Sequence, residues 1–243
     1  MILKRDLLNF FKFTYWIAIL MISYIVDFLI MANTLGNIIV GIDYLRFFGP
    51  GITLVAAYSA SFILARKINI EKENKFDHYL LSLPIKRFDF ILGRAIAGAI
   101  QGLIYSFPLL IINFILIQVQ NLYEIILIII FIFIFSLSMT CLAMIIATTF
   151  RGARNFSLAR SIVYLWLLFG STIFYPINLI SKYFESTTII LLNINPMSFA
   201  VNIFRGILFK SGVNIFDIIG LGIFMVSIIF FGIYSYERSV NKG

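Results

Sequence analysis

Residues that could perform catalysis or bind a metal are scarce in this 243-residue sequence, and they do not group together. The only histidine, His78, is not accompanied by a second histidine or a cysteine, and the only cysteine, Cys141, lies inside an apolar run. The sequence contains no glycine-rich phosphate loop, no HExxH zinc motif and no GxSxG nucleophile elbow. We therefore expect no catalytic, cofactor-binding or metal-binding residues in this chain.

Asp27 is the one ionisable residue in the apolar stretch from Phe13 to Ile42. A charge inside hydrocarbon is costly and commonly functional, so Asp27 is a candidate for a substrate path. The alternative is that the helix ends near residue 28 and that Asp27 lies at the membrane interface. Hydroxyl groups could line the same path, although hydroxyls in membrane helices more often bond to neighbouring helices. These candidates are Tyr58, Ser59, Ser61, Ser171, Thr172 and Tyr175.

The longest polar segment runs from Arg66 to Arg94, and its middle has the pattern of a short amphipathic helix. Asn74 can cap such a helix and Pro84 can end it. Apolar residues spaced three and four apart would then share one face, namely Phe76, Tyr79, Leu80 and Leu83. An amphipathic helix in a loop either rests on lipid headgroups or docks in a groove of a partner protein. Physical reasoning alone slightly favours the headgroups.

The rest of the sequence consists mainly of apolar runs long enough to cross a membrane. Hydrophobic residues make up 61% of the chain and charged residues only 12%, against about a quarter charged in soluble domains. A transmembrane helix needs roughly 20 apolar residues. The sequence therefore predicts an all-α integral membrane protein with a single domain, 1–243. The six expected transmembrane helices are 13–33, 47–65, 95–119, 123–149, 161–180 and 214–236.

The basic residues indicate how these helices are oriented. Although the net charge is +8, Lys and Arg occur in short clusters between the apolar runs, which argues against nucleic-acid binding. Most of them fall in the two ends of the chain, in 66–94 and after the fourth span, and such segments stay in the cytoplasm. We therefore expect both termini to be cytoplasmic.

Two further patterns concern helix packing. Residues 186–204 are long enough for a seventh span, but Asn193, Asn195 and Pro196 interrupt them. We expect a broken, re-entrant hairpin on the outer side, because irregular backbone is tolerated where protein surrounds it. A seventh full helix with an external carboxyl terminus is the alternative. Gly98 and Gly102, followed by Ser106 at the same spacing, predict a close helix contact.

Several segments resemble the ABC-2 type transporter permeases, especially the daunorubicin-resistance and nodulation-factor exporter types. In the polar segment the matching residues are Glu71, Glu73, Phe76, Asp77, Leu80, Leu81, Leu83, Pro84, Arg87, Gly93 and Arg94. The other matching segments are the amphipathic Leu3–Phe11, Gly49-Pro50-Gly51, Phe174-Tyr175-Pro176, and Asn195-Pro196 followed by Arg205. The chain departs from the family at Asn74-Lys75, where many relatives have a glycine-containing turn.

The resemblance implies a permease subunit of an ABC exporter in the cell membrane. Its substrate would be amphipathic, such as a drug, lipid, lipid-linked glycan or peptide. Two permease chains, as a homodimer, would work with two copies of a separate ABC ATPase that binds ATP and Mg. The loop helix would transmit the ATP-driven movement as a coupling helix. The coupling residues would be Glu71, Glu73, Phe76, Asp77, Tyr79, Leu80, Leu83, Pro84 and Arg87.

Two other classes of membrane protein need no ATPase. A stand-alone secondary transporter usually shows internal repeats and several intramembrane ionisable groups, whereas this chain has no evident repeat and only Asp27. An immunity-type membrane protein is a further alternative within this class. An intramembrane enzyme would require a convergent set of ionisable residues, which the sequence does not offer.

Overall fold

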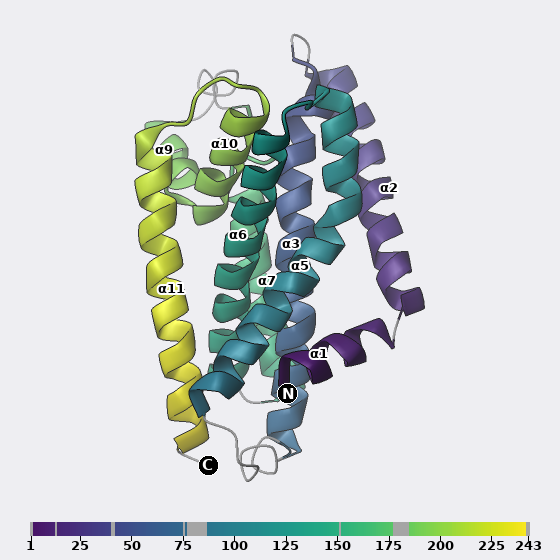
Figure 1. Ribbon diagram of the computed structural model, residues 1–243. Coiled ribbons are helices and arrows are strands. Elements are labelled where there is room, and N and C mark those ends of the chain that lie inside the picture. The colour runs from purple at the N-terminus through teal and green to yellow at the C-terminus, as the bar shows by residue number, and fades with distance from the viewer. Residues whose placement is uncertain are drawn as a thin grey trace.

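The computed structural model describes residues 2–12, 14–39, 42–74, 76, 87–150, 152–176 and 185–241, and these residues form helices joined by turns and irregular segments (Figure 1). Their bounds are α1 Ile2–Phe11, α2 Thr14–Ile38, α3 Tyr44–Glu73, α5 Arg87–Ile117, α6 Leu122–Thr149, α7 Ala153–Phe169, α9 Ser186–Ile194, α10 Pro196–Leu208 and α11 Ile215–Asn241. The long helices run side by side, and both ends of the chain lie at the same end of the bundle (Figure 1).

Among the described residues, five helices are long and apolar enough to cross a membrane, or six if the bent pair α9–α10 counts as one span. The all-α membrane fold is thereby confirmed. The five spans are Ile17–Ile38, Tyr44–Glu73, Phe88–Ile117, Leu122–Thr149 and Ile215–Arg238. The fifth expected span, 161–180, needs correction. Its helix, α7, begins at Ala153 and ends at Phe169, because the chain turns at Gly170 into an irregular segment. With 17 residues, α7 is at the lower limit for crossing hydrocarbon.

Helix α3 forms the centre of the bundle and packs against α2, α5, α6, α7 and α10. It does not end near residue 65, as expected, but continues to Glu73. Its last turns are held by neighbours: the Asn69 amide donates to the Ala147 and Phe150 carbonyl oxygens at 3.3 and 3.0 Å. The Lys72 ammonium donates to the Thr148 carbonyl oxygen at 2.9 Å.

Asn74 ends α3. Its backbone N–H donates to the Ile70 carbonyl oxygen at 3.1 Å, so it caps the carboxyl end of α3. The helix that Asn74 was predicted to begin lies, apart from Phe76, outside the described residues. The third span likewise begins earlier than residue 95, at Arg87. The connection between α3 and α5 is therefore shorter than the polar segment 66–94, because both ends of that segment belong to the helices.

Small residues on α5 bring it close to α6, as their spacing predicted. A Cβ placed on Gly102 would lie 2.5 Å from the Ser136 Oγ, and one on Gly98 would collide with Thr140. The Thr140 hydroxyl in turn donates to the Ser61 Oγ at 3.1 Å. Hydroxyl groups thus bond between helices at the point of closest approach.

The expected break in residues 186–204 is confirmed, and a straight seventh helix does not form. Helices α9 and α10 meet at an angle of 76° around Asn195 and Pro196. The Asn195 side chain accepts from the Met197 N–H at 2.9 Å and donates to the carbonyl oxygens of Trp166 and Gly170 at 2.9 and 2.8 Å. A buried amide with these partners is satisfied, which removes its cost in the membrane.

The α5–α6 contact yields a stability prediction. Gly102→Leu should lower the thermal stability of the purified protein, because overpacking a tight contact costs about 1–3 kcal/mol. The matched control is Gly222→Leu, since nothing lies within 4 Å of a Cβ on that α11 glycine. The stability of each variant is measured by heating the protein in detergent and determining the fraction that stays monodisperse. Equal stability of the two variants would show that the α5–α6 contact is not tight.

Candidate functional site

Helix α1 is amphipathic and lies across the end of the bundle that holds both termini (Figure 1). Its buried residues are Ile2, Asp6 and Phe10, which follow one another at four-residue spacing and so share one face. Asp6 is only 1% exposed, although it is a charged residue. A carboxylate on the buried face of a helix requires partners, and these come from α3 and α5.

Five charged side chains from α1, α3 and α5 form a cluster, hereafter the charge cluster. Its members are Arg5, Asp6, Lys67, Glu71 and Arg94. The Asp6 Oδ1 accepts from the Lys67 ammonium and from the Arg5 guanidinium, each at 2.8 Å. Glu71 pairs with Arg94 and lies 3.4 Å from the Arg5 guanidinium. These ion pairs connect three helices at one end of the bundle.

Arg94 extends the charge cluster to a fourth helix. Its side chain is 1% exposed, and its guanidinium carbon lies 4.6 Å from the ring centre of Phe90 and 5.8 Å from that of Tyr236 on α11. Aromatic faces attract a desolvated cation. Arg94 is thus held by a carboxylate and two aromatic rings.

Three cations face two carboxylates in the charge cluster, and the excess positive charge acts on Asp6. Burial would raise the pKa of Asp6, but the charges of Arg94, Lys67 and Arg5, with the Lys67 hydrogen bond, outweigh burial and hold the pKa below its ordinary 3.8. A carboxyl pKa that is lower in the folded state stabilises the fold above the ordinary value. This stabilisation is lost only as the pH falls through the lowered pKa.

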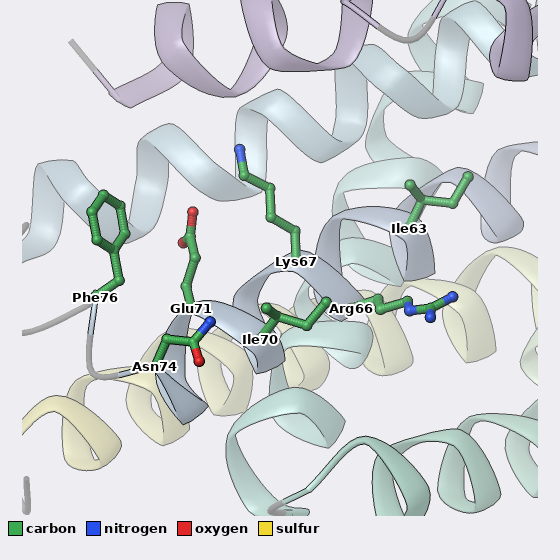
Figure 2. Close-up of a pocket in the computed structure, with 7 residues that line it drawn as sticks. All are labelled: Ile63, Arg66, Lys67, Ile70, Glu71, Asn74 and Phe76. Carbon is green, nitrogen blue, oxygen red and sulfur yellow. The ribbon is translucent and has the colours of Figure 1, made fainter.

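Part of the predicted coupling segment adjoins the charge cluster. Glu71 belongs to the cluster, whereas Glu73 is exposed at the end of α3. Phe76 is 43% exposed and lines a cavity together with side chains of the last turns of α3 (Figure 2). Asp77, Tyr79, Leu80, Leu83, Pro84 and the side chain of Arg87 lie outside the described residues. The coupling helix therefore stays a prediction.

The candidates for a substrate path fall in two places. Asp27 is exposed in the middle of α2, which continues to Ile38, so the interpretation that the helix ends near residue 28 is wrong. Tyr58 and Ser59 are buried on α3, and the Tyr58 ring stacks on Tyr164 of α7 at 5.9 Å. Thr172 and Tyr175 instead belong to the irregular segment that follows α7.

Arg205 of α10 holds that irregular segment against α3. Its guanidinium donates to the carbonyl oxygens of Thr172, Ile173 and Phe47 at 3.0, 3.1 and 3.1 Å. It also stacks on the Phe47 ring, with 3.6 Å between the guanidinium carbon and the ring centre. The Ser198 hydroxyl accepts from the Thr172 N–H at 3.0 Å. Four backbone groups of two segments are thus fixed by two side chains of α10.

Sequence reasoning missed Asp6, Lys67 and the partnership of Glu71 with Arg94. One signal for Asp6 was available, because a lone acidic residue shares the apolar face of Ile2 and Phe10. The remaining pairings join residues far apart in the sequence and leave no local pattern.

A comparison with protein-family models finds a match that covers most of the chain. A family model described as ABC-2 family transporter protein matches residues 43–236. The matched range includes Lys67, Glu71, Arg94 and Arg205, while α1 precedes it. No curated protein sequence matches this chain.

The docking of α1 can be tested by a disulfide. The Cβ of Ile2 lies 3.5 Å from a Cβ placed on Gly93, a separation that a disulfide bridges. In a Cys141→Ala background, Ile2→Cys with Gly93→Cys should therefore cross-link on oxidation. Adding Asp6→Asn should reduce the cross-linked fraction severalfold, because it removes the carboxylate that joins α1 to Lys67 of α3, and a hydrogen bond to a charged group contributes about 1.5–3 kcal/mol.

The control for this experiment is Lys4→Gln, which removes an exposed charge from the same helix. Gel mobility under non-reducing conditions measures the cross-linked fraction. If Asp6→Asn and Lys4→Gln cross-link equally well, the charge cluster does not hold α1 in place.

Proposed function

This chain belongs to the ABC-2 family of transporter proteins, and we propose that it is the permease of an exporter whose ATP is hydrolysed on a separate subunit. As a multi-pass membrane protein, it supplies the path across the bilayer, and the partner ATPase binds ATP and Mg. Two permease chains form a homodimer that works with two ATPase copies. The substrate class is amphipathic: a drug, lipid, lipid-linked glycan or peptide.

The observation that carries the proposal is the position of the charge cluster at both ends of the segment between α3 and α5. Glu71 lies three residues before Asn74, and Arg94 lies in the second turn of α5. Because these two side chains pair, a force on the segment reaches α3 and α5 together. The ion pair of Glu71 with Arg5 would pass the force to α1, and the stacking of Arg94 on Tyr236 would pass it to α11.

Phe76 is the anchor through which the ATPase applies this force. Its ring is partly exposed beside an apolar cavity at the end of α3 (Figure 2). Together with Tyr79, Leu80 and Leu83 it would fill a cleft of the ATPase, as amphipathic helices fill grooves. Movement of the predicted coupling helix would then displace the end of α3.

Movement at that end has to reach the outer side for export. Helix α3 is continuous from Tyr44 to Glu73, and Arg205 attaches its first turn to the irregular segment that contains Thr172. The substrate path would follow α3 from Asp27 and Tyr58 toward Thr172 and Tyr175. Helices α9 and α10 would cover its outer exit.

In this arrangement both termini and the charge cluster are cytoplasmic, in the plasma membrane. Single cysteines in a Cys141→Ala background test this topology, because Ser157 and Ser186 are both exposed. Ser157→Cys should react only with reagent from the cytoplasmic side, and Ser186→Cys only from outside. The measurement is labelling of intact cells by an impermeant maleimide. Labelling of Ser157→Cys in intact cells would contradict the proposed orientation.

The coupling role is tested by truncating the anchor. Phe76→Ala should weaken copurification of the ATPase about thirtyfold, because loss of a central aromatic costs on the order of 2 kcal/mol. The matched control is Phe216→Ala, which truncates an exposed aromatic at the start of α11. Quantitative copurification from membranes measures the ATPase retained by each variant.

The headgroup alternative predicts a different outcome. If the segment rests on lipid, both variants should retain the ATPase equally. In that case Phe76 is not an anchor, and the coupling helix is an interfacial segment.

A further inference from the structure

A small cavity between the end of α3 and the start of α7 has an unusual lining. Its volume is about 230 Å³, and its polar side chains are Arg66, Asn69, Ser157 and Arg160. Neither arginine makes an ion pair with any residue that the structure describes. The Phe62 ring lies 6.0 Å from the Arg160 guanidinium carbon, and the hydroxyl groups of Tyr24, Tyr58 and Tyr164 are also close enough to interact with its charge. Two guanidinium groups without a carboxylate therefore face one cavity.

The walls of this cavity are fixed by hydrogen bonds. Asn69 is 2% exposed, and its amide group donates to the carbonyl oxygens of Ala147 and Phe150, which ties α3 to the end of α6. Helix α7 begins on the far side with Ala153, and its cap residue, Gly152, offers no side chain. The cavity is thus preformed. No carboxylate is among the side chains that line it, and the nearest one at the α7 cap is Glu73, whose Oε1 lies 3.8 Å from a Cβ placed on Gly152.

The sequence places both arginines at the edge of the apolar part of the membrane. Arg66 directly follows the uncharged run 47–65, and Arg160 directly precedes the uncharged run 161–181. Lipid phosphate groups lie at this depth, where basic side chains commonly extend to meet them. Both arginines are at least partly exposed, so a lipid headgroup can reach them.

A second, larger cleft also adjoins Arg66. This space of about 620 Å³ between α1, α2, α3 and α5 has Phe10, Ile17 and Leu20 in its walls, together with Asp6 and Lys67 of the charge cluster. Figure 2 shows that Arg66 extends in a different direction from Lys67 and Glu71, which belong to the charge cluster. A phosphate at Arg66 would therefore have a largely apolar cleft beside it, of the kind that an acyl chain fills.

We propose that Arg66 and Arg160 bind the phosphate group of an anionic phospholipid, whose acyl chain occupies the cleft between α1 and α2. Guanidinium groups bind phosphate oxygens in a bidentate manner, so two of them hold one phosphate firmly. The bound lipid bridges α3 and α7. It belongs to the leaflet at the end of the bundle where the termini lie, and this is the cytoplasmic leaflet in the proposed topology.

Native mass spectrometry of the detergent-solubilised protein tests the proposal, with phosphatidylglycerol, phosphatidylcholine and inorganic phosphate as probes. Phosphatidylglycerol should bind and raise the melting temperature, whereas the other two probes should do neither. Arg66→Gln and Arg160→Gln should each weaken phosphatidylglycerol binding roughly fivefold or more. Arg154→Gln should leave it unchanged, because this exposed arginine of α7 does not line the cavity.

Other outcomes overturn the proposal in distinct ways. Equal phosphatidylglycerol binding by all variants would show that Arg66 and Arg160 do not form a lipid-binding site. An equal loss in Arg154→Gln would indicate diffuse attraction between basic residues and anionic lipid. Stabilisation by millimolar inorganic phosphate that disappears in Arg160→Gln would indicate a free-anion site without a lipid. If Arg66→Gln does not fold, Arg66→Lys decides, because it keeps the charge and should bind with intermediate affinity.

Discussion

The ion pair between Glu71 and Arg94 is the interaction on which the proposed mechanism depends. Removing a charge from water costs several kcal/mol, and removing one partner of a buried pair costs about 3–5 kcal/mol. Arg94 is almost fully buried. Separating the end of α3 from the start of α5 would therefore leave this buried charge without its carboxylate partner. The pair therefore fixes both ends of the segment between them, and its carboxylate also contacts Arg5 of α1.

Buried charges have different partners at the two ends of the bundle. At one end the cations of the charge cluster meet carboxylates, whereas at the other end Arg205 donates to three backbone carbonyl oxygens and stacks on an aromatic ring. Both arrangements attach to the same helix, because Phe47 lies in the first turns of α3 and Glu71 in its last. Helix α3 thus connects the two polar regions as a single buried rod, and the proposed transmission of movement follows it.

Hydropathy was sufficient to predict the membrane class and the approximate spans, and residue chemistry predicted the break at Asn195-Pro196 and the close contact at Gly102. The length of α3 could not be predicted in this way. Its last turns contain Lys67 and Glu71, which mark a loop by composition but are neutralised by partners on α1 and α5. Arg205 was noticed only through a family resemblance, because its acceptors are backbone carbonyl oxygens and those carry no sequence signal.

The most direct measurement concerns the transmission of movement from one end of the protein to the other. In the permease–ATPase complex, the rate of maleimide labelling at Ser186→Cys, in a Cys141→Ala background, is measured with and without ATP. We predict that ATP changes this rate in the otherwise unsubstituted complex and in Glu237→Gln, whose side chain is exposed on α11. In Glu71→Gln the response should disappear while the ATPase stays bound. An undiminished response to ATP in Glu71→Gln would contradict the account.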